Sequence, residues 1–329
     1  MSMRILRGLS LCLQKQSVSP IDSKDNLKGY HNQIGEFLFL VFCIFYRKVT
    51  MKIAAFNVKN LGMKKVNNDI ILKNLIKIVS RYSLVVMQEV QDPTGNAMNK
   101  FLTELNKYGK NKSHPFEMLS SDPIGRNSHK EQFVFFYRHD EIDVIDYYQY
   151  EEENEDVLAR EPFIVRFECP NTVVKNLVLI PVHIDPDDAE NELEALDDVV
   201  EDARRTLETD NIMILGDFNA DGRYLNNETR EALSISSAPY YWLIDEDADT
   251  TTGANDHTYD RIVVYGDEMY DAVVANSAKP FNFQKAYKLG KKMVRLFTCK
   301  HSYYNVVHFS TMLSSQGFLT CLHSGSIHQ

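Results

Sequence analysis

The stretch NIMILGDFNAD, at residues 211–221, joins a buried strand to polar side chains that follow it directly. Its IMIL run is short and continuously apolar, which is the pattern of a strand buried on both faces. Asp217 and Asn219 come two residues apart straight after that run. Because residues just beyond a buried strand are held rigidly and can face a cleft, the stretch predicts a site at the end of a sheet.

Apolar runs of the same kind recur along the chain. Six more strands are predicted, at residues 52–58, 83–90, 131–138, 163–167, 175–183 and 259–266. Two helices are predicted between them, with apolar residues at helical spacing: Ile70, Ile71, Leu75, Ile76 and Val79 in residues 67–82, and Leu193, Leu196, Val200, Ala203 and Leu207 in residues 187–208. Many buried strands with few helices between them predict an α/β (α+β) fold, a four-layer sandwich of two packed mixed β-sheets flanked by helices.

Composition limits the class of protein. The chain of 329 residues has a formal charge of -10, which argues against binding nucleic acid through a broad basic surface. An enzyme that approaches phosphates through a divalent cation remains compatible with that charge. The five cysteines show no metal-ligand spacing and leave at least one unpaired, so they predict no disulfide framework.

The sequence divides into three parts, at residues 1–50, 51–289 and 290–329. Residues 37–46 are ten apolar residues followed by Arg47 and Lys48, too few to span a bilayer as a helix but enough for the core of a secretory signal. The first part is therefore a signal or signal-anchor segment, or else a plain extension or a misplaced start. We expect no stable membrane span.

Polar residues end or begin several of the other predicted strands. Asn57, Glu89 and His183 lie at the ends of theirs, and Asp260 begins the last. Hard divalent cations prefer the oxygen ligands that carboxylates and carboxamides supply. With a histidine to move a proton, such a set can cleave a phosphodiester. Taken singly, each residue is more simply a helix cap or a turn residue. The combination around GDFN is more specific.

Eight segments of the chain, in order, resemble those of the deoxyribonuclease I family, in the endonuclease, exonuclease and phosphatase superfamily. They are KIAAFNVKNLG, VVMQEVQD, GRNSHKEQFVFFYR, REPFIVRF, LIPVHIDPDDAENE, MILGDFNAD, TYDRIVVYG and FNFQKAYKL. The last looks closest to the deoxyribonuclease gamma branch. The resemblance spans about residues 51–289, which we therefore expect to be the nuclease domain.

The resemblance implies a catalytic and metal-binding role for seven residues. Asn57 and Glu89 match metal-site residues, and Asp217 and Asn219 match residues that position metal or phosphate. Glu131 matches the carboxylate that orients a histidine, here His183, as general acid toward the leaving 3′ oxygen. Asp260 matches the carboxylate that supports a second histidine, the base for the attacking water.

The family also implies a substrate and its contacts. Arg160 matches a phosphate contact, while Arg126, His129 and Gln91 lie where the family approaches DNA. We therefore expect an endonuclease that cuts double-stranded DNA to 5′-phosphate products with Mg²⁺ and Ca²⁺, or with Mn²⁺ as a substitute. By the same resemblance we expect a monomer that is secreted or resides in the endoplasmic reticulum lumen, with the nucleus as the alternative.

The chain departs from the family after residue 289. The closing SDHxPV motif, which carries the second histidine and the last strand, is absent, and only His301 falls near the expected spacing. We expect its loss to leave a sheet edge or part of the core unfilled. The family's disulfide positions are here Gly222 and the neighbourhood of His257.

These departures keep two alternatives open. The chain could be a catalytically impaired splice variant or pseudoenzyme of the family that binds DNA or protein without cutting. It could also be another phosphoesterase of the superfamily, acting on phosphoinositides, sphingomyelin or abasic DNA. The GRNSHKEQ and REPF segments argue against the second alternative.

Overall fold

The computed structural model describes residues 51–126, 128–152, 156–251, 256–297 and 304–309. The N-terminal extension at residues 1–50 and His301 lie outside these described residues. No helix in the described part of the chain is long and apolar enough to cross a membrane.

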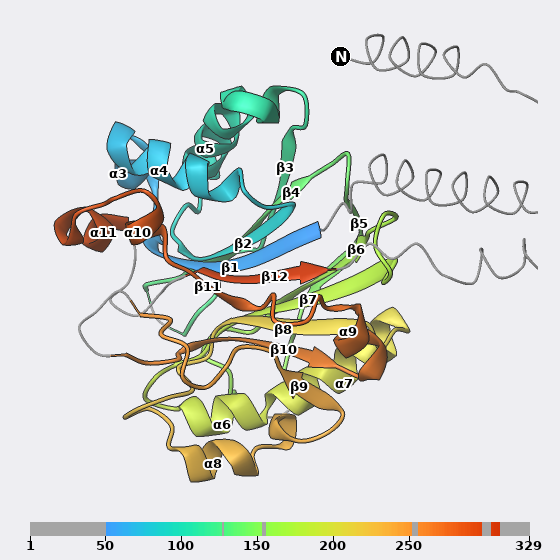
Figure 1. The fold of residues 1–329 in the computed structure, drawn as a ribbon. Helices are drawn as coiled ribbons and strands as arrows, with labels where there is room; N and C mark the ends of the chain where they lie inside the picture. Colours follow the sequence, from blue (N-terminus) through green and yellow to red (C-terminus); the bar gives the residue numbers. More distant parts are fainter. Residues whose placement is uncertain (1–50, 127, 153–155, 252–255, 298–303, 310–329) are drawn as a thin grey trace, which may run out of the picture. The chain divides into compact units, whose positions relative to one another are not determined.

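Two six-stranded mixed sheets form the centre of the fold (Figure 1). The first sheet has the order β11 (Lys279–Phe281), β12 (Tyr304–Phe309), β1 (Met51–Leu61), β2 (Leu84–Val90), β4 (Gln132–Arg138) and β3 (Phe116–Ser120). The second has the order β5 (Asp143–Gln149), β6 (Phe163–Glu168), β7 (Asn176–His183), β8 (Ile212–Asp217), β10 (Asp260–Tyr265) and β9 (Tyr240–Trp242). Each sheet holds one parallel pair, β1 with β2 and β7 with β8, among antiparallel neighbours.

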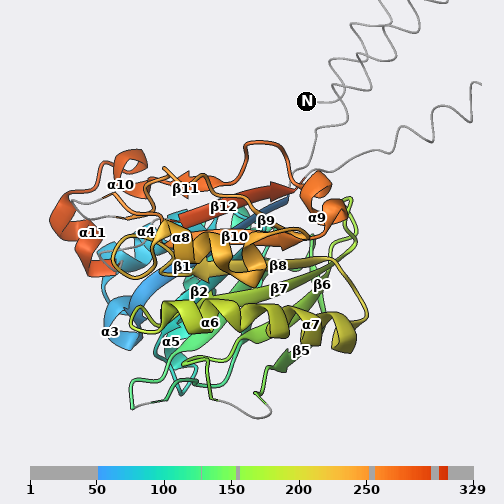
Figure 2. The ribbon, with the colours of Figure 1, turned by 90° about the horizontal axis from the view of Figure 1, so that it is seen from below.

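Helices cover the outer face of each sheet (Figures 1 and 2). On the first sheet lie α3 (Met63–Val66), α4 (Asp69–Val79), α5 (Asn96–Lys107), α10 (Phe283–Ala286) and α11 (Lys291–Phe297), with the short helix η1 (Gly109–Lys112). On the side of the second lie α6 (Ala189–Glu194), α7 (Leu196–Leu207), α8 (Asn227–Ala232) and η2 (Ser234–Ser236), while α9 (Asp267–Ala272) buries Met269 and Ala272 in the core between the sheets. Buried apolar residues form one cluster between the sheets and one under each helical layer. The predicted four-layer sandwich is confirmed.

The seven predicted strands are all present, and the two predicted helices are present with differences. The acidic helix is divided into α6 and α7, with Leu193, Leu196, Val200, Ala203 and Leu207 buried as predicted. The first helix is α4, whose N-cap Asn68 accepts hydrogen bonds from the backbone N–H groups of Ile70 and Ile71. Of the apolar residues at helical spacing in this helix, Ile71, Leu75, Ile76 and Val79 are buried, while Ile70 is 54% exposed at the first turn.

Strand β12 fills the place beside β1 that we expected to find open. Its backbone pairs antiparallel with β1, Ala54 lying opposite Val306, and its other side pairs with β11, Lys279 lying opposite Val306. The expectation of an unfilled sheet edge is therefore corrected. Residues 304–309 belong to the first sheet, although they fall in the divergent tail of the sequence.

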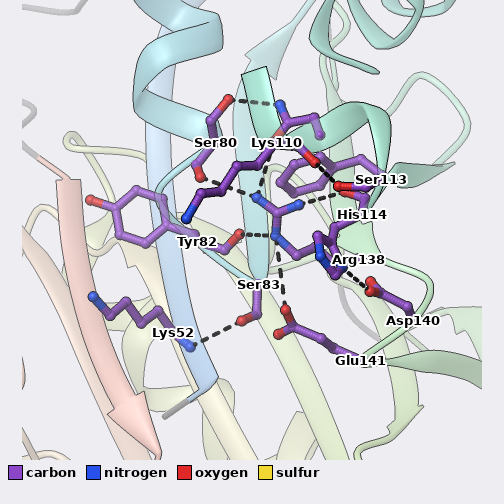
Figure 3. A network of polar contacts seen from close by, with 12 residues as sticks. Lys52, Ser80, Tyr82, Ser83, Lys110, Ser113, His114, Arg138, Asp140 and Glu141 are labelled. Carbon is purple, nitrogen blue, oxygen red and sulfur yellow. Dashed lines mark hydrogen bonds and ion pairs between the residues drawn. The ribbon is translucent and has the colours of Figure 1, made fainter. Parts of the chain in front are cut away.

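A buried arginine joins the loops at one end of the first sheet (Figure 3). The Arg138 guanidinium donates hydrogen bonds to the backbone oxygens of Tyr82, Ser80 and His114 and to the Asn111 side chain. Burial lowers the pKa of Arg138, and these acceptors compensate for the lost water. This network is structural and lies apart from the polar strand ends described next.

Candidate active site

Three polar residues from the second sheet lie side by side on adjacent strands. His183 ends β7 and is the register partner of Asp217, which ends the parallel strand β8. Asp217 is also the register partner of Asp260, the first residue of the antiparallel strand β10. Sequence-distant residues are therefore brought into one row because their strands end or begin at the same level of the sheet.

The glycine of GDFN is required by a contact between the two sheets. Gly216 has φ +145, and a Cβ there would come within 2.1 Å of the backbone oxygen of Val182 and 2.2 Å of the Gln88 side-chain nitrogen. The Gln88 amide crosses from β2 to donate to that same Val182 oxygen. A larger residue at position 216 would push the sheets apart where the polar residues meet.

The first sheet contributes a carboxamide and a carboxylate to the same region. Asn57 Nδ2 donates to Asp217 Oδ2 at 3.2 Å, which joins β1 to β8. Glu89 follows Gln88 and has the uncommon φ of +55, and its Oε2 accepts from the Asn60 N–H at 3.2 Å. Asn219, with φ +48, donates from its backbone N–H to Asp217 Oδ1 at 3.3 Å. These positions are held against local backbone preference, as functional sites often are.

His183 is one of three charged side chains in contact with one another. His183 Nδ1 lies 2.7 Å from Glu131 Oε2, and Arg160 Nε lies 3.2 Å from Glu131 Oε1. An ionised carboxylate can only accept, so Nδ1 carries the proton and points Nε2 away from Glu131. Arg160 Nη1 also donates to the backbone oxygen of His183 at 3.3 Å.

The charges of these side chains move both pKa values. Burial alone would raise the pKa of Glu131, but the hydrogen bond and charge of His183, with the charge of Arg160, lower it overall. Burial alone would lower the pKa of His183, but its hydrogen bond to Glu131 and that carboxylate's charge raise it. The geometry therefore favours a protonated imidazole beside an ionised carboxylate, which suits a general acid.

Asp260 is a buried carboxylate with an unsatisfied oxygen. Its side chain is 3% exposed, and within the described part of the chain its Oδ2 has no hydrogen-bond partner. Burial and then the charge of Asp217 raise its pKa well above the ordinary value. His301, the one histidine near the spacing of the family's second histidine, lies outside the described residues.

The donor set around Asp217 fits a hard divalent cation. The predicted ligands Asn57, Glu89 and Asp217 carry the carboxamide and carboxylate oxygens that a hard divalent cation prefers, and Asn57 and Asp217 are in contact across the two sheets. Asn219 donates its Nδ2 to the Ile184 oxygen at 2.8 Å, which supports the loop after His183.

The residues predicted to approach DNA lie outside this row. Arg126 Nε lies 3.0 Å from Asp156 Oδ1, in an exposed ion pair that joins two separate loops. His129 is exposed, and Gln91 is partly exposed just after β2. Their part in DNA binding stays a prediction.

Two groups were missed by the sequence analysis. Glu192 is 1% exposed in α6, and burial raises its pKa to about 7. The carboxylates of Glu152, Asp156 and Glu161 approach one another within 4.8 Å near the surface. The sequence did hold a sign of the buried Glu192, because it is an acidic residue next to Leu193 on the apolar face of the helix predicted at residues 187–208.

Gly222 and His257 lie close together, at and near the places where the resemblance puts the family's disulfide. Gly222 has φ +64, and a Cβ there would come within 2.7 Å of the His257 ring. His257 Nδ1 lies 3.4 Å from Asp221 Oδ2, and its ring lies 4.9 Å from that of Tyr259. A packed imidazole therefore joins the same two segments that a disulfide would join.

Comparison with known proteins assigns this arrangement to a class. Residues 54–280 match the model of the endonuclease/exonuclease/phosphatase family. The human Nocturnin catalytic domain with bound sulfate has a TM-score of 0.53 at 12% identity, covering 80% of this chain and 96% of that one. Truncated Caenorhabditis elegans TDP2 has a TM-score of 0.51 at 12% identity, covering 79% and 97%. At such identity these structures show the shared fold alone.

Sequence relatives narrow the class. Deoxyribonuclease-1 of Oryctolagus cuniculus is 38% identical over 251 residues, which cover 75% of this chain and 88% of the relative. The Canis lupus familiaris protein of the same name is 39% identical over 252 residues, with 75% and 88% covered. The chain belongs to the deoxyribonuclease I family, within the endonuclease/exonuclease/phosphatase superfamily.

Proposed function

We propose that this chain is an endonuclease that hydrolyses phosphodiester bonds of double-stranded DNA with the help of a divalent cation, leaving 5′-phosphate ends. The single observation that carries the proposal is the pairing of His183 with Glu131 at 2.7 Å, beside Asp217 and Asn57 at the ends of the two sheets. The relatives named deoxyribonuclease-1 support DNA as the substrate.

In the proposed mechanism, protonated His183 gives its Nε2 proton to the 3′ oxygen as the bond from that oxygen to phosphorus breaks. A water oxygen forms the new bond to phosphorus and passes its proton to a neighbouring water molecule. The phosphate stays on the 5′ side. Glu131 holds the imidazole through Nδ1 and stabilises its positive charge. Arg160 positions Glu131 and stands close enough to contribute positive charge near the phosphate.

The cation has a defined place in this scheme. Asn57, Glu89 and Asp217 would hold it, with Asn219 supporting the loop beside it. When bound, Mg²⁺ neutralises charge that develops on the phosphoryl group. We propose Mg²⁺ and Ca²⁺ as the ions in use, Mn²⁺ as a substitute, and secretion or the endoplasmic reticulum lumen as the location.

A plasmid assay tests the proposal. Full-length protein incubated with supercoiled plasmid and Mg²⁺ plus Ca²⁺ should convert it to nicked circles, and chelation by EDTA should stop the reaction. The nicks should be sealed by DNA ligase without prior end treatment, because ligase needs a 5′-phosphate and a 3′-hydroxyl. Well-folded protein that makes no nicks, or nicks equally well after His183→Ala, would contradict the proposal.

A second candidate function is supported by the unsatisfied Asp260 Oδ2. Without a histidine on that carboxylate, the attacking water lacks its base, a contribution of about a hundredfold to ten-thousandfold. The chain would then bind DNA or a protein partner without cutting it. A DNA complex detected by fluorescence anisotropy in Ca²⁺, together with no nicking above that of His183→Ala, would favour this function.

A further inference from the structure

Glu192 is a buried carboxylate that the proposed mechanism does not use. Its Oε1 accepts a hydrogen bond from the backbone N–H of Ala159 at 3.2 Å, and its Oε2 accepts from the backbone N–H of Asp185 at 3.3 Å. Ala159 directly precedes Arg160, and Asp185 lies two residues after His183. One side chain therefore joins the two segments that carry these site residues.

The same two segments also meet through the site itself. Arg160 Nε lies 3.2 Å from Glu131 Oε1, and Arg160 Nη1 donates to the His183 oxygen at 3.3 Å. Glu131 in turn holds the His183 ring. The contacts form a closed ring, from Glu192 through Arg160, Glu131 and His183 and back to Glu192 through the backbone. Such a ring fixes relative positions that a single contact would leave free.

We propose that Glu192 is a positioning residue, whose carboxylate clamps the segment carrying Arg160 to the segment following His183 and so holds Arg160 against Glu131. The inference rests on the proposed function, in which His183 is the general acid. It assigns to Glu192 no contact with DNA.

The pKa of Glu192 distinguishes a positioning role from a purely stabilising one. Burial raises its pKa to about 7 although two backbone N–H groups bind its oxygens. The charge of Asp185 also raises the pKa of Glu192, and the charge of Arg160 lowers it. The charge of Glu192 in turn raises the pKa of Arg126.

Because the folded-state pKa lies above the ordinary 4.5, the folded protein binds the proton more tightly than the unfolded chain. The stability that this group contributes is therefore greatest below pH 4.5 and is lost as the pH rises toward 7. At pH 8 the ionised carboxylate is retained at a cost to stability.

The test compares full-length wild type with Glu192→Gln, Arg160→Ala, their double variant and a control, Glu190→Gln. Glu190 lies in the same helix with its side chain exposed. At pH 8 we expect Glu192→Gln to unfold at a temperature no lower than wild type, yet to nick plasmid about 10- to 100-fold more slowly at saturating DNA. The control should match wild type in both measurements.

The double variant and the pH dependence of the nicking rate show whether Glu192 acts through Arg160. The double variant should be no slower than Arg160→Ala alone, because both changes break the same ring. The wild-type rate should rise as the pH passes through about 7 and Glu192 ionises, and this rise should be missing from Glu192→Gln. Three results would overturn the proposal. They are a double variant whose loss of nicking rate is the product of the two single losses, a wild-type nicking rate for Glu192→Gln, and a clear drop in the unfolding temperature of Glu192→Gln.

A readout without catalysis keeps the inference separate from the proposed function. In the NMR spectrum of histidine-labelled protein, the His183 ring signals, assigned with His183→Ala, should shift alike in Glu192→Gln and Arg160→Ala and stay unchanged in Glu190→Gln. If wild type does not nick DNA, the proposed function fails, and this spectrum still decides the positioning role. Unshifted His183 signals in Glu192→Gln would overturn it.

Discussion

At the scale of single residues, the site is a set of ordinary side chains with altered proton affinities. His183 and Glu131 each move the other's pKa in the direction that keeps both charged, against the burial that opposes charge. Asp260 shows the opposite case, since burial and the charge of Asp217 raise its pKa more than the hydrogen bond with Thr250 and the charge of Arg261 lower it. In the proposed function the first pair is the general acid and its support, while the described residues supply no hydrogen-bond partner to Asp260 Oδ2.

Replacing Glu131 with glutamine should move the alkaline limb of the pH–rate profile. Without the carboxylate, burial lowers the pKa of His183, so the imidazole loses its proton at a lower pH than in wild type. The nicking rate at pH 8 should fall by about a hundredfold or more. Rates measured between pH 5.5 and 9 check this, and an unmoved alkaline limb would mean that another group sets it.

Replacing Asp260 with asparagine should lower the nicking rate only a little. Its Oδ2 has no hydrogen-bond partner in the described residues, so it orients no base there. We expect the nicking rate to fall by less than about tenfold, where a working base contributes about a hundredfold or more. A loss as large as that of His183→Ala would instead show that a residue outside the described part, such as His301, uses this carboxylate.

Much of the residue-scale picture could be predicted from sequence, because Asn57, Asp217, His183 and Asp260 stand at the ends or starts of apolar runs. The resemblance supplied the role of Glu131. Glu192 could not be predicted, since it acts through backbone N–H groups of Ala159 and Asp185, and a sequence does not show which backbone groups a side chain will meet.

At the scale of elements, burial decided which strands could be predicted. The seven predicted strands lie inside the sheets and carry continuous apolar runs. The four edge strands β3, β5, β9 and β11 were missed, because an edge strand needs no such run, and in β5 most side chains are exposed or half-buried. Strand β12 was missed for another reason. It lies in the segment where the family resemblance ends, so similarity gave no guide to its pairing with β1.

Proline at position 306 tests whether β12 is an interior strand. Val306 pairs with Ala54 on one side and Lys279 on the other, so proline would remove a ladder hydrogen bond from a strand paired on both sides. We expect Val306→Pro to lower the free energy of unfolding by about 2–4 kcal/mol. Urea unfolding followed by circular dichroism measures it.

A matched proline in an edge strand provides the control. Ile145 lies at the register shift between β5 and β6 with its side chain 47% exposed, so Ile145→Pro should cost less than about 1 kcal/mol. If the two variants lost equal free energy of unfolding, or if Val306→Pro lost none, the placement of β12 inside the sheet would be contradicted.

At the scale of the whole molecule, the proposed function reconciles the charge of -10 with a DNA substrate through a small number of phosphate contacts. Two packed sheets bring the site residues together at their strand ends, and in the proposed function a cation would supply local positive charge in place of a basic surface. The sequence could predict this layered fold and the charge argument. It could not predict how the divergent tail completes the first sheet.

Salt dependence measures the number of those contacts. With Arg160 as the predicted phosphate contact and Arg126 as a second cation predicted to approach DNA, log Kd for duplex DNA in Ca²⁺ should rise with log salt concentration with a slope of about 2. Fluorescence anisotropy of a labelled duplex between 50 and 300 mM salt gives that slope. A slope of about 6 or more would reveal a basic surface that the described residues do not show.

The central claim is that His183 protonates the leaving 3′ oxygen, and a substrate with sulfur in place of that oxygen tests it most directly. A thiolate leaves without needing a proton, so the general acid becomes unnecessary at the cleaved bond. We predict that His183→Ala slows cleavage of the normal duplex by about a hundredfold to ten-thousandfold but slows cleavage of the 3′-thio duplex by less than about tenfold. Equal slowing of both substrates would contradict the role of His183 as general acid.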